Sequence, residues 1–110
     1  MNLLHFIETS VFQRKIDSLL SKDEYQQFQE YLRLDPEAGA TISATGGCRK
    51  IRWAIQGKGK SGGIRVIYYY LNAKGEIYLL LAYAKNEREN ISDEQKSQLK
   101  KFISMIGGEK

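Results

Sequence analysis

Basic residues are concentrated in one stretch of this chain, and their spacing suggests that several of them act on the same anion. From Ala38 to Gly75 there is no aspartate or glutamate, but seven of the seventeen lysines and arginines fall there. They are Arg49, Lys50, Arg52, Lys58, Lys60, Arg65 and Lys74. Positive charge without internal counter-charge indicates an anionic partner, and a polyphosphate such as RNA or DNA is the obvious class.

Four of these cations, Arg49, Lys50, Arg52 and Arg65, lie on two predicted strands. Residues 48–55 alternate with a period of two, which places Lys50 and Arg52 on one strand face. Arg65 lies in the otherwise apolar run 64–71, where an arginine is costly without an anionic partner or an open sheet edge. The alternative is a structural ion pair with Glu76 or Glu87. The pattern favours a ligand-facing arginine.

The connection between these strands, residues 56–63, contains four glycines and two lysines. Its letters match a dinucleotide fingerprint, but that motif needs a helix after the loop, and a strand follows here. Glycines let the backbone approach a phosphate closely, and Lys58 and Lys60 bring charge to the same place. The alternative is an ordinary solvated hairpin loop.

Other reactive side chains are few. Tyr83 precedes Lys85 at the end of a predicted strand, where it is equally consistent with base stacking or hydrogen bonding and with core packing. One histidine, His5, and one cysteine, Cys48, cannot form a metal site, so we expect neither a metal nor a cofactor.

The order of the helices and strands that must position these residues predicts an α+β domain. Thr9 or Ser10 caps a first helix, the capping box Ser21–Glu24 opens a second, and Pro36 stops it. Expected strands cover residues 3–7, 48–55, 64–71 and 76–85, with a turn at 72–75 and a last helix from a capping box at 92–95. This order predicts an antiparallel-dominated sheet, an N-terminal helical hairpin and a C-terminal helix, with the helices on one side. Residues 37–47 are turn-like.

The bulk properties fit one soluble domain spanning residues 1–110. A lone cysteine suits a reducing compartment, and the N-terminus lacks the features of a signal peptide. The longest apolar run, residues 77–84, is too short for a membrane span. We expect a cytoplasmic protein without a membrane partner.

Three segments together resemble the RelE/ParE toxin superfamily, and most closely its HigB-like branch: GCRKIR at 47–52, GKGKSGGIRVIYY at 57–69 and LLLAYAKNE at 79–87. The resemblance covers essentially the whole chain. It implies the toxin of a type II toxin–antitoxin pair, a ribosome-dependent endonuclease that cuts A-site mRNA without a metal. The mRNA 2′-hydroxyl attacks the adjacent phosphate, leaving a 2′,3′-cyclic phosphate and a 5′-hydroxyl. The implied partners are a cognate antitoxin, the ribosome and mRNA, with a free toxin that is monomeric.

The resemblance also implies roles for residues. Arg65 matches the arginine that contacts the scissile phosphate, and Lys85 lies in the basic motif that ends the last strand. With Lys58, Lys60 and Tyr83 they form the predicted catalytic group, and the predicted RNA-binding group is Arg49, Lys50, Arg52 and Asn86. The family has an arginine at Asn86 and a tyrosine near Ile91 or Ser92, and some HigB toxins use histidines that this chain lacks. The general acid and base are therefore left open.

Two other functions remain possible at this point. The same fold is used by ParE-like toxins, which inhibit DNA gyrase by binding and cut nothing, and fold alone cannot separate the two. A nucleic-acid-binding module without catalysis is the third possibility. Converging cations around one phosphate favour the nuclease.

Overall fold

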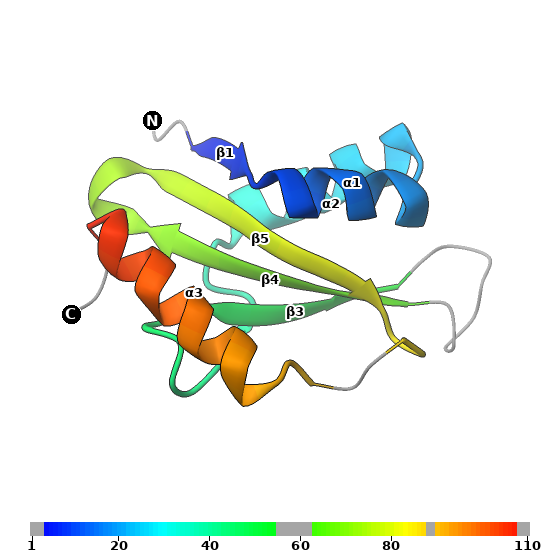
Figure 1. Cartoon of the computed structure of the whole chain (residues 1–110). Coiled ribbons are helices and arrows are strands. Elements are labelled where there is room, and N and C mark those ends of the chain that lie inside the picture. Colours follow the sequence, from blue (N-terminus) through cyan, green and yellow to red (C-terminus); the bar gives the residue numbers. More distant parts are fainter. Residues whose placement is uncertain (1–3, 55–62, 88–89, 108–110) are drawn as a thin grey trace.

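The computed structural model describes residues 4–54, 63–87 and 90–107. The chain forms an α+β domain, which confirms the predicted class (Figure 1). Its elements are β1 (His5–Glu8), α1 (Ser10–Leu19), α2 (Lys22–Leu34), β2 (Ala40–Thr41), β3 (Arg49–Trp53), β4 (Ile64–Leu71), β5 (Glu76–Ala84) and α3 (Asp93–Met105). The predicted helical hairpin is α1–α2, and the predicted C-terminal helix is α3.

The strands of the described ranges form one sheet in the order β1-β5-β4-β3-β2. Only β1 pairs in parallel, with β5, so the sheet is antiparallel-dominated as predicted. Strand β2 was not predicted, because it lies in the segment 37–47 that we expected to be turn-like. Ala40 and Thr41 pair with Lys50 and Arg49. Two residues carry no readable periodicity, so this edge strand exists through its tertiary pairing alone.

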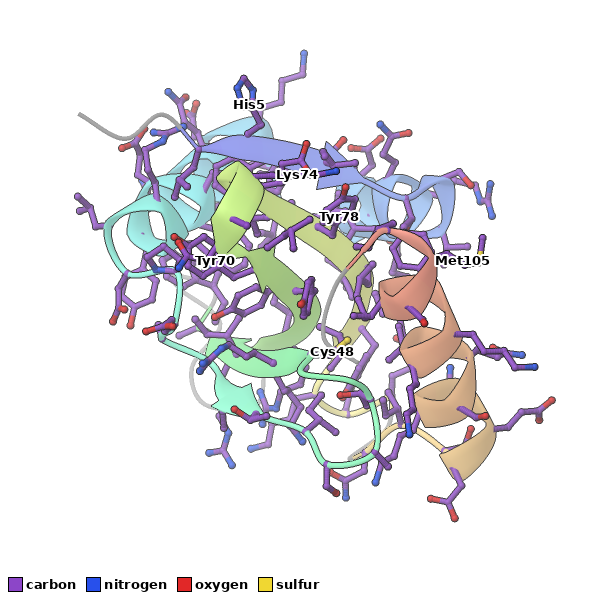
Figure 2. The ribbon with its side chains drawn as sticks, turned by 90° about the vertical axis from the view of Figure 1, so that its left-hand side faces the viewer. His5, Cys48, Tyr70, Lys74, Tyr78 and Met105 are labelled. Atoms are coloured by element: carbon purple, nitrogen blue, oxygen red, sulfur yellow. The ribbon has the colours of Figure 1, made fainter. Side chains whose placement is uncertain are left out.

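The helices cover both faces of the sheet, so the prediction that they share one side is wrong (Figures 1 and 2). Helices α1 and α2 pack on the face that contains Val66 and Tyr68. Helix α3 packs on the opposite face, against Ile67 and Tyr69. Alternate residues of β4 point to opposite faces, and nearly all of them are apolar, so each face needs a cover.

The predicted helix starts are confirmed. Thr9 Oγ1 accepts a hydrogen bond from the Phe12 N–H at 3.0 Å and so caps α1. Capping boxes open α2 at Ser21 and α3 at Ser92. Each box satisfies N–H groups that a helix terminus otherwise leaves unpaired. The turn before β5 ends at Gly75 with φ of 66°, the positive value for which glycine was expected there.

Tyr68 ties the segment after α2 to the sheet. Its ring is fully buried, and its hydroxyl accepts a hydrogen bond from the Gly39 N–H at 2.9 Å. The same hydroxyl donates to the Pro36 carbonyl oxygen at 2.9 Å. A Cβ at Gly39 would lie 2.9 Å from the Tyr68 ring, so only glycine fits against it. This contact fixes where the chain passes from the helical hairpin to β2 and β3.

Tyr68→Phe removes both hydrogen bonds and leaves the buried Gly39 N–H without a partner. We expect it to lower the free energy of unfolding by about 1–3 kcal/mol, measured by urea denaturation. Tyr70→Phe is the matched control, because the Tyr70 hydroxyl bonds the exposed Asn72 side chain. That change should stay within about 0.5 kcal/mol. Equal losses in the two variants would contradict the role given to Tyr68.

Candidate functional site

Two arginines lie directly opposite one another on neighbouring strands. The register pairs Arg52 of β3 with Arg65 of β4, and Arg65 in turn with Tyr83 of β5. We call these three residues the arginine row. Since Ile51 and Val66, one position away, belong to the core under α1 and α2, the row projects from the α3 face of the sheet.

The arginine row is electrostatically unfavourable on its own. Like charges directly opposite in a sheet destabilise it, and Arg65 is only 7% exposed. Its hydrogen bond within the described structure runs from Nη1 to the Ile64 carbonyl oxygen at 3.2 Å. A guanidinium has five N–H donors, so this bond uses a small part of its capacity.

The ion-pair alternative for Arg65 is not formed among the described residues. The register places Glu76 opposite Leu71, at the far end of β4. The Glu87 carboxylate contacts Lys15, with Lys15 Nζ and Glu87 Oε2 2.8 Å apart. The other ion pairs of the described residues are Arg33–Glu30 and Arg49–Glu37. Within the part of the chain that the structure describes, Arg65 therefore has no carboxylate partner.

Lys50 is on the same face as the arginine row, two residues before Arg52. Its Nζ donates to Asn90 Oδ1 at 3.0 Å, across 40 positions of sequence. Asn90 directly precedes the buried Ile91 and the α3 cap. Sequence reasoning missed Asn90, because no local pattern connects a polar residue before a helix with a lysine on a distant strand.

Lys85 and Asn86 follow β5 and are exposed. The Lys85 N–H donates to the Gly63 carbonyl oxygen at 3.0 Å, so this turn lies at the arginine-row end of the sheet. Glu87 Oε1 accepts from the Ala84 N–H at 3.2 Å, while its other oxygen contacts Lys15. Glu87 therefore anchors the turn that carries Lys85 and Asn86 to α1. This role was not apparent from the sequence.

Tyr83 is 4% exposed and belongs to the core between the sheet and α3. It also lines a pocket of about 300 Å³ between α1, β5 and the start of α3. The pocket walls are Val11, Arg14, Lys15, Leu81, Ala82, Tyr83, Glu87, Ile91 and Gln95. Tyr83 therefore packs in the core under α3 and also lines this pocket. Its pairing with Arg65 places it next to the candidate site.

Not all predicted residues meet at this site. Arg49 alternates with Lys50 and so belongs to the other face, where Nη1 donates to the carbonyl oxygens of Glu37 at 3.0 Å and Gly39 at 2.8 Å. It supports the segment before β2. Lys58 and Lys60 lie outside the described residues.

The remaining reactive side chains are separate from the row. Figure 2 shows His5 projecting outward from β1 and Cys48 in the interior. Burial raises the pKa of the Cys48 thiol to about 11, which keeps it protonated at neutral pH. In the described ranges, no three His, Cys, Asp or Glu side chains are grouped so that they could hold a metal ion. None of the helices described is long and apolar enough to cross a membrane.

These features define a small α+β domain that gathers basic side chains at one end of an antiparallel sheet. The family model described as the RelE toxin of the RelE/RelB toxin–antitoxin system matches residues 35–108, and the chain belongs to this family. The superfamily resemblance is thereby confirmed, and the HigB-like branch stays a prediction.

Two solved Escherichia coli structures have a similar fold. A chain of the intact RelBE toxin–antitoxin complex is 13% identical, with a TM-score of 0.57, over 74% of this chain and 96% of that one. The toxin RelE in the free state, in a variant with two arginine-to-alanine changes, is 14% identical with a TM-score of 0.55. That match covers 78% of this chain and 87% of the other. At these identities the likeness concerns the fold.

Arg65→Met should make the fold more stable and less responsive to phosphate-like anions. Removing one of two opposed charges is worth about 0.2–1 kcal/mol, and methionine fills much of the same buried space. Millimolar inorganic pyrophosphate should raise the Tm of the original chain by mass action and that of Arg65→Met much less. Thermal unfolding with and without pyrophosphate measures both effects.

Arg33→Met is the control for this pair of measurements. Arg33 is exposed on α2, beside Glu30 and over the Phe6 ring, so its loss should lower stability by no more than about 1 kcal/mol and leave the pyrophosphate response intact. An equal pyrophosphate response in Arg65→Met and Arg33→Met would show that the arginine row does not bind the anion.

Proposed function

We propose that this chain is the toxin of a type II toxin–antitoxin pair and acts as a ribosome-dependent mRNA endonuclease. The observation that carries the proposal is the opposition of Arg52 and Arg65 in the sheet register. Two guanidinium-bearing residues at one place, with Arg65 buried, form a preorganised site for a single phosphate. Membership of the RelE toxin family supports the same conclusion.

The proposed reaction is transesterification within the RNA. The 2′-oxygen loses its proton and bonds to the adjacent phosphorus, and the bond from phosphorus to the 5′-oxygen breaks. The leaving 5′-oxygen takes up a proton, so the products are a 2′,3′-cyclic phosphate and a 5′-hydroxyl. The RNA supplies its own nucleophile, and the protein must stabilise the charge that builds on the phosphate oxygens and move two protons.

The residues are assigned to these tasks by position. Arg65 binds the scissile phosphate, with Arg52 opposite it and Lys50 two residues along the same strand. Lys85 lies at the end of β5 near this site, and Tyr83 is paired with Arg65 across the strands. The candidates for the general acid and the general base are Lys85, Tyr83 and the predicted Lys58 and Lys60.

The proposed partners follow from the same assignment. One similar structure is a chain of the RelBE toxin–antitoxin complex, and we propose a cognate antitoxin for this chain. An antitoxin that inhibits by covering the arginine row would present acidic groups to it. The free toxin is proposed to be monomeric and cytoplasmic, and to act in the ribosomal A site on mRNA.

Induction of the chain in bacteria for a few minutes should produce new mRNA 5′ ends within translated codons. These ends should disappear when translation is blocked, because the proposed enzyme cuts on the ribosome. Arg65→Ala should reduce cutting by roughly a hundredfold or more, the usual cost of removing a group that stabilises transition-state charge. Arg33→Ala should cut like the original chain. Sequencing of 5′ ends with and without a translation inhibitor measures this.

Two outcomes would contradict the proposal. Growth arrest with intact mRNA and a DNA-damage response would support a gyrase inhibitor of the ParE kind instead. Undiminished toxicity of Arg65→Ala at equal protein level would overturn the assignment of the site.

A further inference from the structure

The contact between Lys50 and Asn90 joins two parts of the molecule that are otherwise separate. Lys50 comes from β3 and Asn90 from the segment before α3, and the ammonium nitrogen lies 3.0 Å from the amide oxygen. Lysine can only donate hydrogen bonds, so the side-chain oxygen of Asn90 must be the atom that faces it. The orientation of the amide is therefore fixed by its partner.

Asn90 is attached to the fold on its C-terminal side. The next residue, Ile91, is buried in the core between the sheet and α3. Ser92 then caps α3, with its N–H donating to Gln95 Oε1 at 3.0 Å and its Oγ accepting from the Gln95 N–H at 3.1 Å. The backbone that follows Asn90 is therefore held in place by Ile91 and Ser92, while the Asn90 side chain itself is exposed.

The chemistry of an amide suits a lysine that must keep its charge. A carboxylate at this distance would pair with the ammonium and cancel most of its field. An amide oxygen accepts one of the three N–H groups and leaves the other two, with the full charge, for another acceptor. Lys50 shares its strand face with Arg52, about 7 Å along the strand, so a restrained Lys50 extends the arginine row by one cation.

We infer that Asn90 is a positioning residue, whose side-chain oxygen holds the Lys50 ammonium beside the arginine row and leaves its charge available to an RNA phosphate. This inference rests on the proposed function only in naming RNA as the polyanion. It assigns to the segment before α3 a part in binding RNA that neither the sequence pattern nor the family match provides.

The test separates orientation from charge by measuring how RNA affinity depends on salt. The probe is a short single-stranded RNA with 2′-O-methyl groups, which cannot undergo the proposed cleavage. The protein is the full chain made by chemical synthesis, because a translating system would be the target of the proposed enzyme. Each cation that neutralises a phosphate contributes about 0.7 to the slope of log affinity against log salt concentration on single strands. Asn90→Asp places a counter-charge against Lys50 and should reduce that slope by about 0.7.

Asn90→Ala has a different expected result. Lys50 keeps its charge, so the slope should not change, but binding RNA must now order a free lysine side chain. Affinity should fall by about two- to tenfold, the cost of immobilising one long side chain. A merely structural defect would not reproduce these two separate responses.

Asn72→Asp is the matched control. It makes the same chemical change and the same change in net charge, but at the far end of the sheet, where Asn72 Oδ1 accepts a bond from the Tyr70 hydroxyl. Its slope should equal that of the original chain. Equal slopes in Asn90→Asp and Asn72→Asp would overturn the inference, as would unchanged affinity in Asn90→Ala or a lack of salt-dependent RNA binding by the original chain.

Because the probe cannot be cut, this experiment is independent of mRNA cleavage in cells. Intact mRNA after induction would refute the nuclease and leave the salt slopes as the measure of Asn90. An unchanged slope in Asn90→Asp would refute the role of Asn90 and leave the nuclease to be judged from the mRNA 5′ ends.

Discussion

The burial of β4 on both faces is the constraint on which the rest of the structure depends. All its residues except Tyr70 are buried, and they alternate between the core under α1 and α2 and the core under α3. Such a strand requires neighbours on both edges and cover on both sides. Burial on both faces also restrains the side chains of β4, and Arg65 is one of them.

Arg65 is therefore the exception in a strand whose other buried residues are uncharged. Its neighbours Ile64 and Val66 are completely buried and apolar, while Arg65 is buried with a charge and faces Arg52. Real sequences depart from consistency mainly where function requires it. The cost of burying the guanidinium is met by the two cores on either side, and the benefit is a cation whose position does not have to be ordered when an anion binds.

The sequence was sufficient for features that depend on local chemistry. Capping boxes at Ser21 and Ser92, the glycine at position 75, the alternation in β3 and the apolar run of β4 each depend on a few neighbouring residues, so each could be predicted correctly. The charged Arg65 within an apolar strand could also be recognised, because residues 64–71 alone are enough to show it. The face of the sheet against which α3 packs could not be predicted. An apolar stripe on a helix indicates that the stripe is buried but does not indicate which face of the sheet buries it.

Features formed by distant contacts were missed for the same reason. Strand β2 exists because two residues pair with β3. Arg49 and Lys50 are neighbours in sequence, but the pleat sends one to support the segment before β2 and the other to Asn90. Composition located the basic stretch but could not divide it into residues that support the segment before β2 and residues that project from the α3 face of the sheet.

Charge is also divided between the layers of the molecule. Residues 4–37, which include the helical hairpin, contain four basic and seven acidic residues, a net charge of 4 − 7 = −3, whereas residues 38–75 carry seven basic and no acidic residues. A polyanion is therefore attracted to the sheet and repelled by the hairpin, and fields of this kind orient a protein before contact. The arginine row lies on the face away from the hairpin, so the proposed attraction of a polyanion by this separation of charge would also direct it toward Arg52 and Arg65.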